Sequence, residues 1–247
     1  VREGALWPET DTVAKPSLGD QEAIRKTADS HWAFATIQSP ELPETSDPDW
    51  ARHPIDRCVL AKLVSNGLKP SSAARRPTLI RRAFNDLIGL PPTPEIIESV
   101  FGSPSLRGKT FKEIVERLLE SDHYGERMAR HWMDVARYAD TRDFLAAADL
   151  RYPFAFTYRD WLISAFNQDM PYDDFVRHQL AADFLAERND DPNLAALGFL
   201  TVGPLFRTNA LQRVADCIDV VTRGLMGLTG TCARCHDHKY DPSSIED

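Results

Sequence analysis

Residues 211–236 read LQRVADCIDVVTRGLMGLTGTCARCH, a helical pattern that runs directly into a cysteine motif. The spacing of apolar residues over 211–228 predicts one long helix. Gly227 and Gly230 lie just before the cysteine motif, and glycines suit both a sharp helix exit and a close approach of the backbone to a neighbouring group. The stretch therefore places a chemically active segment at the end of a helix.

The same helical spacing recurs through most of the chain, while no apolar–polar alternation is long enough to predict a sheet. We expect helices over residues 54–66, 76–88, 94–101, 110–120, 123–138, 156–166, 171–185 and 193–200. Between 31 and 54 four prolines favour an extended course, which Trp32 and Phe34 would dock on the core. The expected fold is mainly α: an irregular multi-helix domain with long extended proline-rich loops and a C-terminal C-x-x-C-H haem-attachment segment.

Cys232-Ala233-Arg234-Cys235-His236 matches the C-x-x-C-H signature of covalent haem c attachment. Two thiols three positions apart on one turn can each reach a vinyl group of one porphyrin. His236 then lies beside the iron and supplies its proximal imidazole ligand. The motif predicts one covalently bound haem c on Cys232, Cys235 and His236.

Two other interpretations of the motif remain open. Zinc could bind Cys232, Cys235, His236 and His238, which lie within seven residues, although ligands this close together strain a tetrahedral site. Alternatively, the cysteines form a disulfide or an inert pair that only stabilises the fold.

The sixth ligand of the iron is open at this point. His131 is the first candidate for a distal ligand, because it lies on a predicted helix rich in aromatic residues. A five-coordinate iron would favour small-molecule chemistry over electron transfer. The other candidates are His123, His178, Met128, Met133, Met170 and Met226.

Two charged groups have both structural and functional interpretations. The first group is a helical ridge that forms either a salt-bridge network or an arginine cluster for haem propionates; it comprises Arg127, Arg130, Asp134 and Arg137. The second group would build an ion-pair network or a calcium site, although no EF-hand spacing is present; it comprises Asp140, Asp143, Arg159, Asp160, Asp169, Asp173 and Asp183.

The composition limits the possible partners. A net charge of −8 over 247 residues, with the charges interspersed, argues against nucleic acid and anionic lipid. The longest uncharged stretch, residues 192–206, is shorter than the roughly 20 apolar residues of a membrane-spanning helix and contains two prolines. Residues 1–30 are polar and predict a linker, and residues 31–247 predict one helical domain.

Several segments, in order over about residues 31–247, resemble one known family, the domain of unknown function of large secreted planctomycete cytochrome-like proteins. His178 and Ala182 stand where glutamate and glycine are commoner in the family, and residues 141–155 are atypical. The matching segments are HWAF (31–34), PIDR (54–57), RR (81–82), DLIGLPPTP (86–94), HYGER (123–127), RHW (130–132), DVARYAD (134–140), YRDW (158–161), DMPYD (169–173) and CARCHDHKYDP (232–242).

The resemblance implies a periplasmic or secreted protein with a preceding cytochrome c domain, whose tail would be residues 1–30, and a further C-terminal domain. It implies no established reaction. We expect an electron-transfer module. The alternatives are a haem-dependent oxidoreductase that acts with the C-terminal domain on carbohydrate or peroxide, or a structural module.

Overall fold

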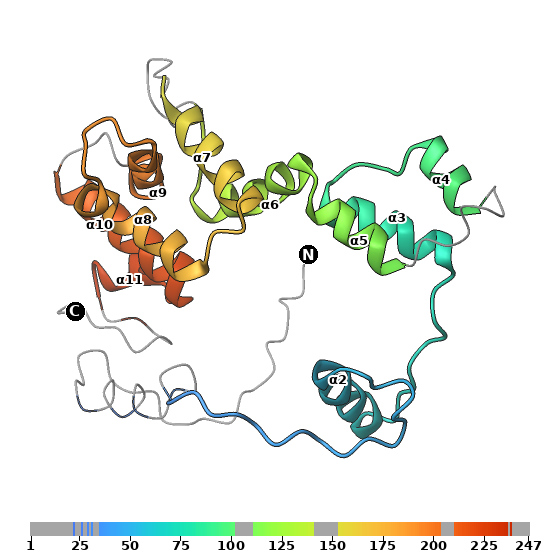
Figure 1. The fold of residues 1–247 in the computed structure, drawn as a ribbon. Helices are drawn as coiled ribbons and strands as arrows, with labels where there is room; N and C mark the ends of the chain where they lie inside the picture. Colours follow the sequence, from blue (N-terminus) through green and yellow to red (C-terminus); the bar gives the residue numbers. More distant parts are fainter. Residues whose placement is uncertain are drawn as a thin grey trace, which may run out of the picture. The chain divides into compact units, whose positions relative to one another are not determined.

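The computed structural model is made of helices, labelled in Figure 1, and divides into two compact units. Unit 1 comprises residues 1–34, 87–89 and 117–247, and unit 2 comprises residues 35–86 and 90–116. The structure describes residues 35–101, with the side chains of 98–101 excepted, 111–140, 153–203, 210–236, and Glu22, Lys26, Asp29, His31 and His238. The predicted linker over 1–30 and the docking of Trp32 and Phe34 lie almost wholly outside these residues.

Unit 2 consists of short helices joined by irregular segments. Helix α2 (Pro54–Ser65) begins at a capping box in which His53 accepts from the amide of Ile55, and it ends before Gly67, whose φ is +69°. The Thr93 hydroxyl caps α4 at the amide of Ile96. The helices of this unit are α2, α3 (Arg76–Leu87), α4 (Pro94–Phe101) and the first part of α5 (Phe111–Leu119).

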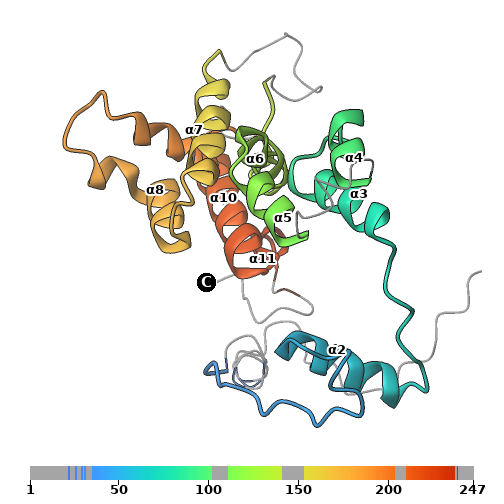
Figure 2. The ribbon, with the colours of Figure 1, turned by 45° about the vertical axis from the view of Figure 1, so that its right-hand side comes forward.

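Unit 1 contains the main hydrophobic core. Its helices are α6 (Asp122–Val135), α7 (Ala155–Asn167), α8 (Tyr172–Leu185), η2 (Pro192–Leu197), α9 (Gly198–Thr201), α10 (Ala210–Val221), η3 (Thr222–Met226) and α11 (Gly230–Ala233). Helix α6 packs on α7, α8 packs on η2, and α10 contacts α9 and α11 (Figure 2). The core side chains include Tyr158, Leu162, Phe199 and Val220.

The mainly helical prediction is confirmed, and the described residues contain no strand. Two predicted boundaries are wrong. The helix expected over 123–138 ends at Val135, and the helix expected over 211–228 changes at Thr222 into one π-helical turn that closes at Gly227 with φ +69°. The first difference lies just before Arg137, and the second lies just before the cysteine motif. Helical periodicity does not indicate where the chain leaves a helix for such a residue or motif.

A buried glutamine joins three helices of the core. The Gln179 side chain on α8 is 1% exposed, and its Oε1 accepts from Trp132 Nε1 on α6 at 2.6 Å and from Tyr158 OH on α7 at 2.8 Å. Its Nε2 donates to the Phe175 carbonyl at 3.2 Å. Every polar atom of this buried amide is therefore paired, and its acceptor fixes the positions of two large aromatic rings.

We predict that Gln179→Leu lowers the free energy of unfolding by about 2–5 kcal/mol, because it leaves the Trp132 and Tyr158 donors buried without an acceptor. Chemical denaturation measures the change. The matched control is Gln168→Leu, because Gln168 is exposed and its amide bonds only Ser164 Oγ. The control should lie within about 0.5 kcal/mol of wild type, and equal losses in the two variants would contradict the role of Gln179.

Candidate functional site

The cysteine motif forms a short helical turn in unit 1. Helix α11 covers Gly230–Ala233, and the Cys232 carbonyl accepts from the amides of Cys235 at 3.3 Å and His236 at 3.4 Å. Both thiols are free and exposed, and His236 is exposed as well. We refer to residues 230–236 as the thiol turn. It presents two thiols and an imidazole at one place on the surface.

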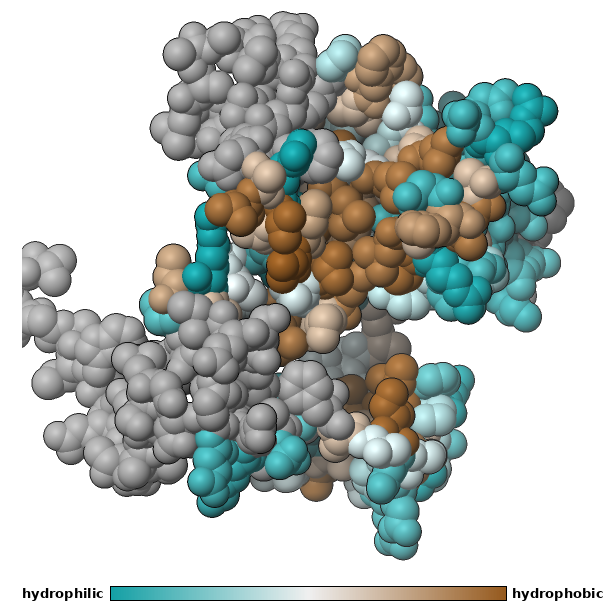
Figure 3. All heavy atoms as spheres, turned by 90° about the vertical axis from the view of Figure 1, so that its left-hand side faces the viewer, coloured by the Kyte–Doolittle hydropathy of each residue, from teal (hydrophilic) through white to brown (hydrophobic). Residues whose placement is uncertain are grey.

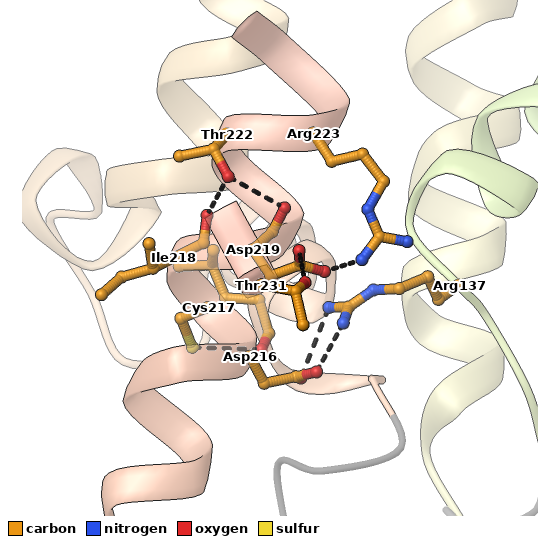
Figure 4. Close-up of polar contacts among 9 residues, drawn as sticks. Arg137, Asp216, Cys217, Ile218, Asp219, Thr222, Arg223 and Thr231 are labelled. Carbon is orange, nitrogen blue, oxygen red and sulfur yellow. Dashed lines mark hydrogen bonds and ion pairs between the residues drawn. The ribbon is translucent and has the colours of Figure 1, made fainter. Parts of the chain in front are cut away.

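One hydrogen bond to α10 and one close approach to η3 position the thiol turn. The Thr231 hydroxyl donates to Asp219 Oδ1 (Figure 4). A Cβ placed on Gly230 would lie only 3.0 Å from Thr222 Oγ1, so this close approach favours glycine. The residue immediately before the first cysteine is thus bonded to a carboxylate on the neighbouring helix.

Asp219 and Asp216 turn two buried carboxylates toward two arginines (Figure 4). Asp219, 6% exposed, pairs with Arg223 one turn later on the chain. Asp216, 4% exposed, pairs with Arg137, whose NH1 lies 2.5 Å from Oδ1. Buried carboxylates need such partners, because an unpaired charge inside a protein is strongly destabilising.

Arg137 does not continue the helical ridge expected from the sequence. It lies beyond the end of α6 with a φ of +57°, an uncommon conformation for a residue other than glycine. This backbone turn lets its guanidinium pair with Asp216 of α10. A Cβ on Gly203 would lie 2.4 Å from Asp216 Oδ2, so a glycine is needed beside the pair. The Arg137–Asp216 pair supports the structural interpretation of this arginine.

Cys217 is the cysteine of α10, and it lies inside unit 1 and outside the thiol turn. Its thiol contacts the Leu200 carbonyl at 3.5 Å. Burial, followed by the charge of Asp216, raises the pKa of the Cys217 thiol, so the protonated form is favoured. This thiol is therefore unreactive compared with an exposed one.

The structure places the candidate distal ligands on other elements. His131 is exposed on α6, on a different side of that helix from the buried Ala129, and its assignment as distal ligand stays a prediction. His123 Nδ1 lies 2.8 Å from Glu126 Oε2. His178 Nδ1 lies 2.8 Å from the Asp174 carbonyl oxygen, and its ring is beside Trp161. Both of these histidines have local structural contacts.

Three of the acidic residues proposed for calcium are engaged in local pairs. Asp140 accepts from Tyr138 OH at 2.6 Å, Asp160 pairs with Arg159, and Asp173 pairs with Arg177. Burial and the bond to Asp140 raise the pKa of Tyr138 to about 12. Asp143 lies outside the described residues. Within the described part of the chain, no three His, Cys, Asp or Glu side chains group closely enough to hold a metal ion, and this includes Cys232, Cys235, His236 and His238.

The donors of the thiol turn are of the kind that covalent haem c attachment would use. Cys232 on α11 and Cys235 in the turn after it are free, exposed thiols three positions apart, and His236 follows them. Thioether formation needs two accessible thiols, not four converging ligands. Cys232 and Cys235 would form the attachments and His236 would bind the iron.

A comparison with family models matches residues 54–247 to PSCyt2, described as a protein of unknown function (DUF1549). The chain belongs to this family. The match covers the chain from α2 through the thiol turn, so both units lie largely within the PSCyt2 region. Searches of curated proteins and of solved structures gave no match to the chain. Within the described residues of this PSCyt2 chain, no helix is long and apolar enough to cross a membrane.

Three residues of the site escaped the sequence analysis of this PSCyt2 chain: Asp216, Asp219 and Thr231. A signal was available, because Asp216, Asp219 and Arg223 recur at helical spacing on a segment otherwise rich in apolar residues. The partner of Asp216, by contrast, is 79 positions away in the sequence. Only the tertiary structure reveals that pairing.

We predict that Thr231→Val loosens the thiol turn of the PSCyt2 chain, because valine has the same shape but cannot donate to Asp219. A loss of about 1 kcal/mol would raise amide hydrogen exchange over residues 230–236 about fivefold. Hydrogen-exchange mass spectrometry measures this rate. Thr157→Val is the control, since the Thr157 hydroxyl bonds only the nearby Phe154 carbonyl. Unchanged exchange in the Thr231 variant would show that its hydroxyl does not hold the turn.

Proposed function

We propose that this chain is a c-type haem-binding module that transfers electrons. The observation that carries the proposal is the pair of free, exposed thiols, three positions apart on one helical turn and followed by His236. This arrangement has the chemistry and the spacing that covalent haem attachment requires. None of the three side chains is buried, so each is accessible for attachment.

The attachment needs only the thiols of the chain and the two vinyl groups of the porphyrin. Each thiol adds across one vinyl double bond, so that a carbon–sulfur bond forms and the thiol hydrogen moves to the other vinyl carbon. No electrons are lost or gained, and no oxidant is required. The bound iron would supply one-electron chemistry by alternating between its ferrous and ferric forms.

Exposure of the thiol turn favours electron transfer over chemistry in a closed pocket. A group attached at Cys232 and Cys235 would keep part of its edge close to solvent, where a redox partner can approach it. The buried pairs of Asp216 and Asp219 make α10 a well-defined support for that group. A six-coordinate, low-spin iron spectrum would fit this role, and a five-coordinate, high-spin spectrum would favour the alternative of a haem-dependent oxidoreductase.

We also propose a cellular location and electron partners for the protein. Haem c attachment takes place outside the cytoplasm, so a periplasmic or secreted protein is expected. The resemblance to planctomycete cytochrome-like proteins supports a preceding cytochrome c domain and a C-terminal domain of the same polypeptide as electron partners. His131 remains the proposed distal ligand, and calcium would at most be an additional structural ion.

Zinc binding and a disulfide remain the alternatives at this motif. Among the described residues no three His, Cys, Asp or Glu side chains form a metal-holding group, and Cys232 and Cys235 are free thiols. A zinc site would also need its ligands to close into a tetrahedron.

We predict that the full chain, matured in an exporting host that attaches haem c, gains the mass of one haem that survives denaturation. A Cys232→Ala/Cys235→Ala variant should lose this gain entirely, because no thioether can form. Mass spectrometry of the intact denatured protein measures the attachment.

Cys58→Ala provides the matched control, since Cys58 is also exposed but stands alone on α2. It should retain the full mass gain. Wild-type protein without any added mass would contradict haem attachment, and a mass lower by two hydrogens would identify a disulfide instead.

A further inference from the structure

Three apolar side chains stand exposed along one face of α10. Leu211 is 78% exposed, Val214 is 58% exposed and Ile218 is 54% exposed. Steps of three and four residues place them on one side of a helix, over a length of about 10 Å. We call this row the α10 stripe. Asp216, Asp219 and Val220 are buried, so the two sides of the helix have different environments.

Apolar side chains also gather around this part of unit 1. Figure 3 looks at the side of the molecule where α9 and α10 lie in Figure 1, and shows a broad apolar area there. An apolar surface of this kind indicates a binding partner, because leaving it in water is unfavourable. The α10 stripe is part of this surface and is expected to be covered by such a partner.

The α10 stripe ends at the thiol turn. A Cβ on Gly230 would lie 3.9 Å from Ile218 Cγ2 and 3.0 Å from Thr222 Oγ1. The Thr231 hydroxyl bonds Asp219, the residue after Ile218. Figure 2 shows α11 beside the C-terminal end of α10. Any flat apolar group held by Cys232 and Cys235 is therefore tethered next to the stripe.

We propose that the α10 stripe is the wall on which the porphyrin ring packs, an inference that rests on the proposed haem attachment. A covalent tether would confine the ring to the neighbourhood of Ile218. Contact between the ring and the α10 stripe is then intramolecular and carries no further entropic cost of bringing two molecules together. The three exposed side chains match a flat apolar surface and offer it no charge. The PSCyt2 family description assigns no such surface.

Packing against the α10 stripe has a measurable electronic consequence. Apolar side chains keep water from one face of the ring and lower the local dielectric constant. A low dielectric constant disfavours the ferric form, which carries one more positive charge than the ferrous form. Making the stripe polar should therefore shift the equilibrium toward ferric iron and lower the reduction potential.

The test compares Val214→Ser with Val64→Ser in the full, haem-loaded chain. Val64 lies on α2 and is 54% exposed, so the two substitutions are alike in chemistry and in exposure. Val214→Ser should shift the ferric-to-ferrous ratio about tenfold toward ferric, which is about 59 mV for a one-electron couple. Val64→Ser should leave the potential unchanged. Spectroelectrochemical titration measures both.

Each result separates this inference from the proposed function. Wild-type protein that attaches no haem overturns both. If haem is attached but wild type and Val214→Ser have equal reduction potentials, the packing of the porphyrin on the α10 stripe is contradicted and the haem attachment is not. If that variant instead dissociates a dimer in sedimentation, a second copy covers the α10 stripe. If Val214→Ser does not fold, Leu211→Ser repeats the test at the most exposed position of the α10 stripe. An unchanged reduction potential in Leu211→Ser would equally contradict packing of the porphyrin on the stripe.

Discussion

The contact between Asp219 and the Thr231 hydroxyl is the interaction on which the site depends. It joins a helix with a buried face to a short turn that has little packing of its own. Asp219 is nearly buried and also pairs with Arg223, so its carboxylate is fixed from two sides. A carboxylate held in this way accepts a stronger hydrogen bond than a neutral acceptor does. The two thiols take their position from this contact.

The position of α10 is fixed by its contacts with the rest of unit 1. Gln179 ties α6, α7 and α8 together through two aromatic donors, and Arg137 connects the end of α6 to α10 through Asp216. The buried pair is sensitive to the loss of one partner, because the remaining charge would have no compensation. The same arrangement that stabilises the helices therefore also fixes the support beneath the thiol turn.

Local signals in the sequence were sufficient for most helices. Pro54 and Gly67 mark the start and end of α2, and Thr93 identifies the start of α4. The irregular end of α6 was not predictable in this way. Arg137 has a left-handed backbone and pairs with Asp216. Because Asp216 lies far along the chain, no periodic pattern in the sequence indicates this pairing. The π-helical turn over Thr222–Met226 likewise has no signal in the helical spacing of the sequence.

The candidate site shows the same division between local and distant information. The motif identified Cys232, Cys235 and His236 directly, because attachment chemistry depends on residues that are neighbours in sequence. The residues that hold the motif in place, Asp219 among them, become recognisable only when α10 and α11 are seen together. His131, chosen from composition and helix context, lies on a helix that the described contacts do not connect to the thiol turn.

A pyridine haemochrome spectrum of the matured, denatured protein tests the central claim most directly. Saturation of each vinyl group shifts the α band of the reduced haemochrome to shorter wavelength, so the band position counts the thioether bonds. Attachment through Cys232 and Cys235 predicts the band of a porphyrin with both vinyl groups saturated, in a ratio of one haem to one chain. A spectrum with intact vinyl groups, or no haemochrome band at all, would contradict it.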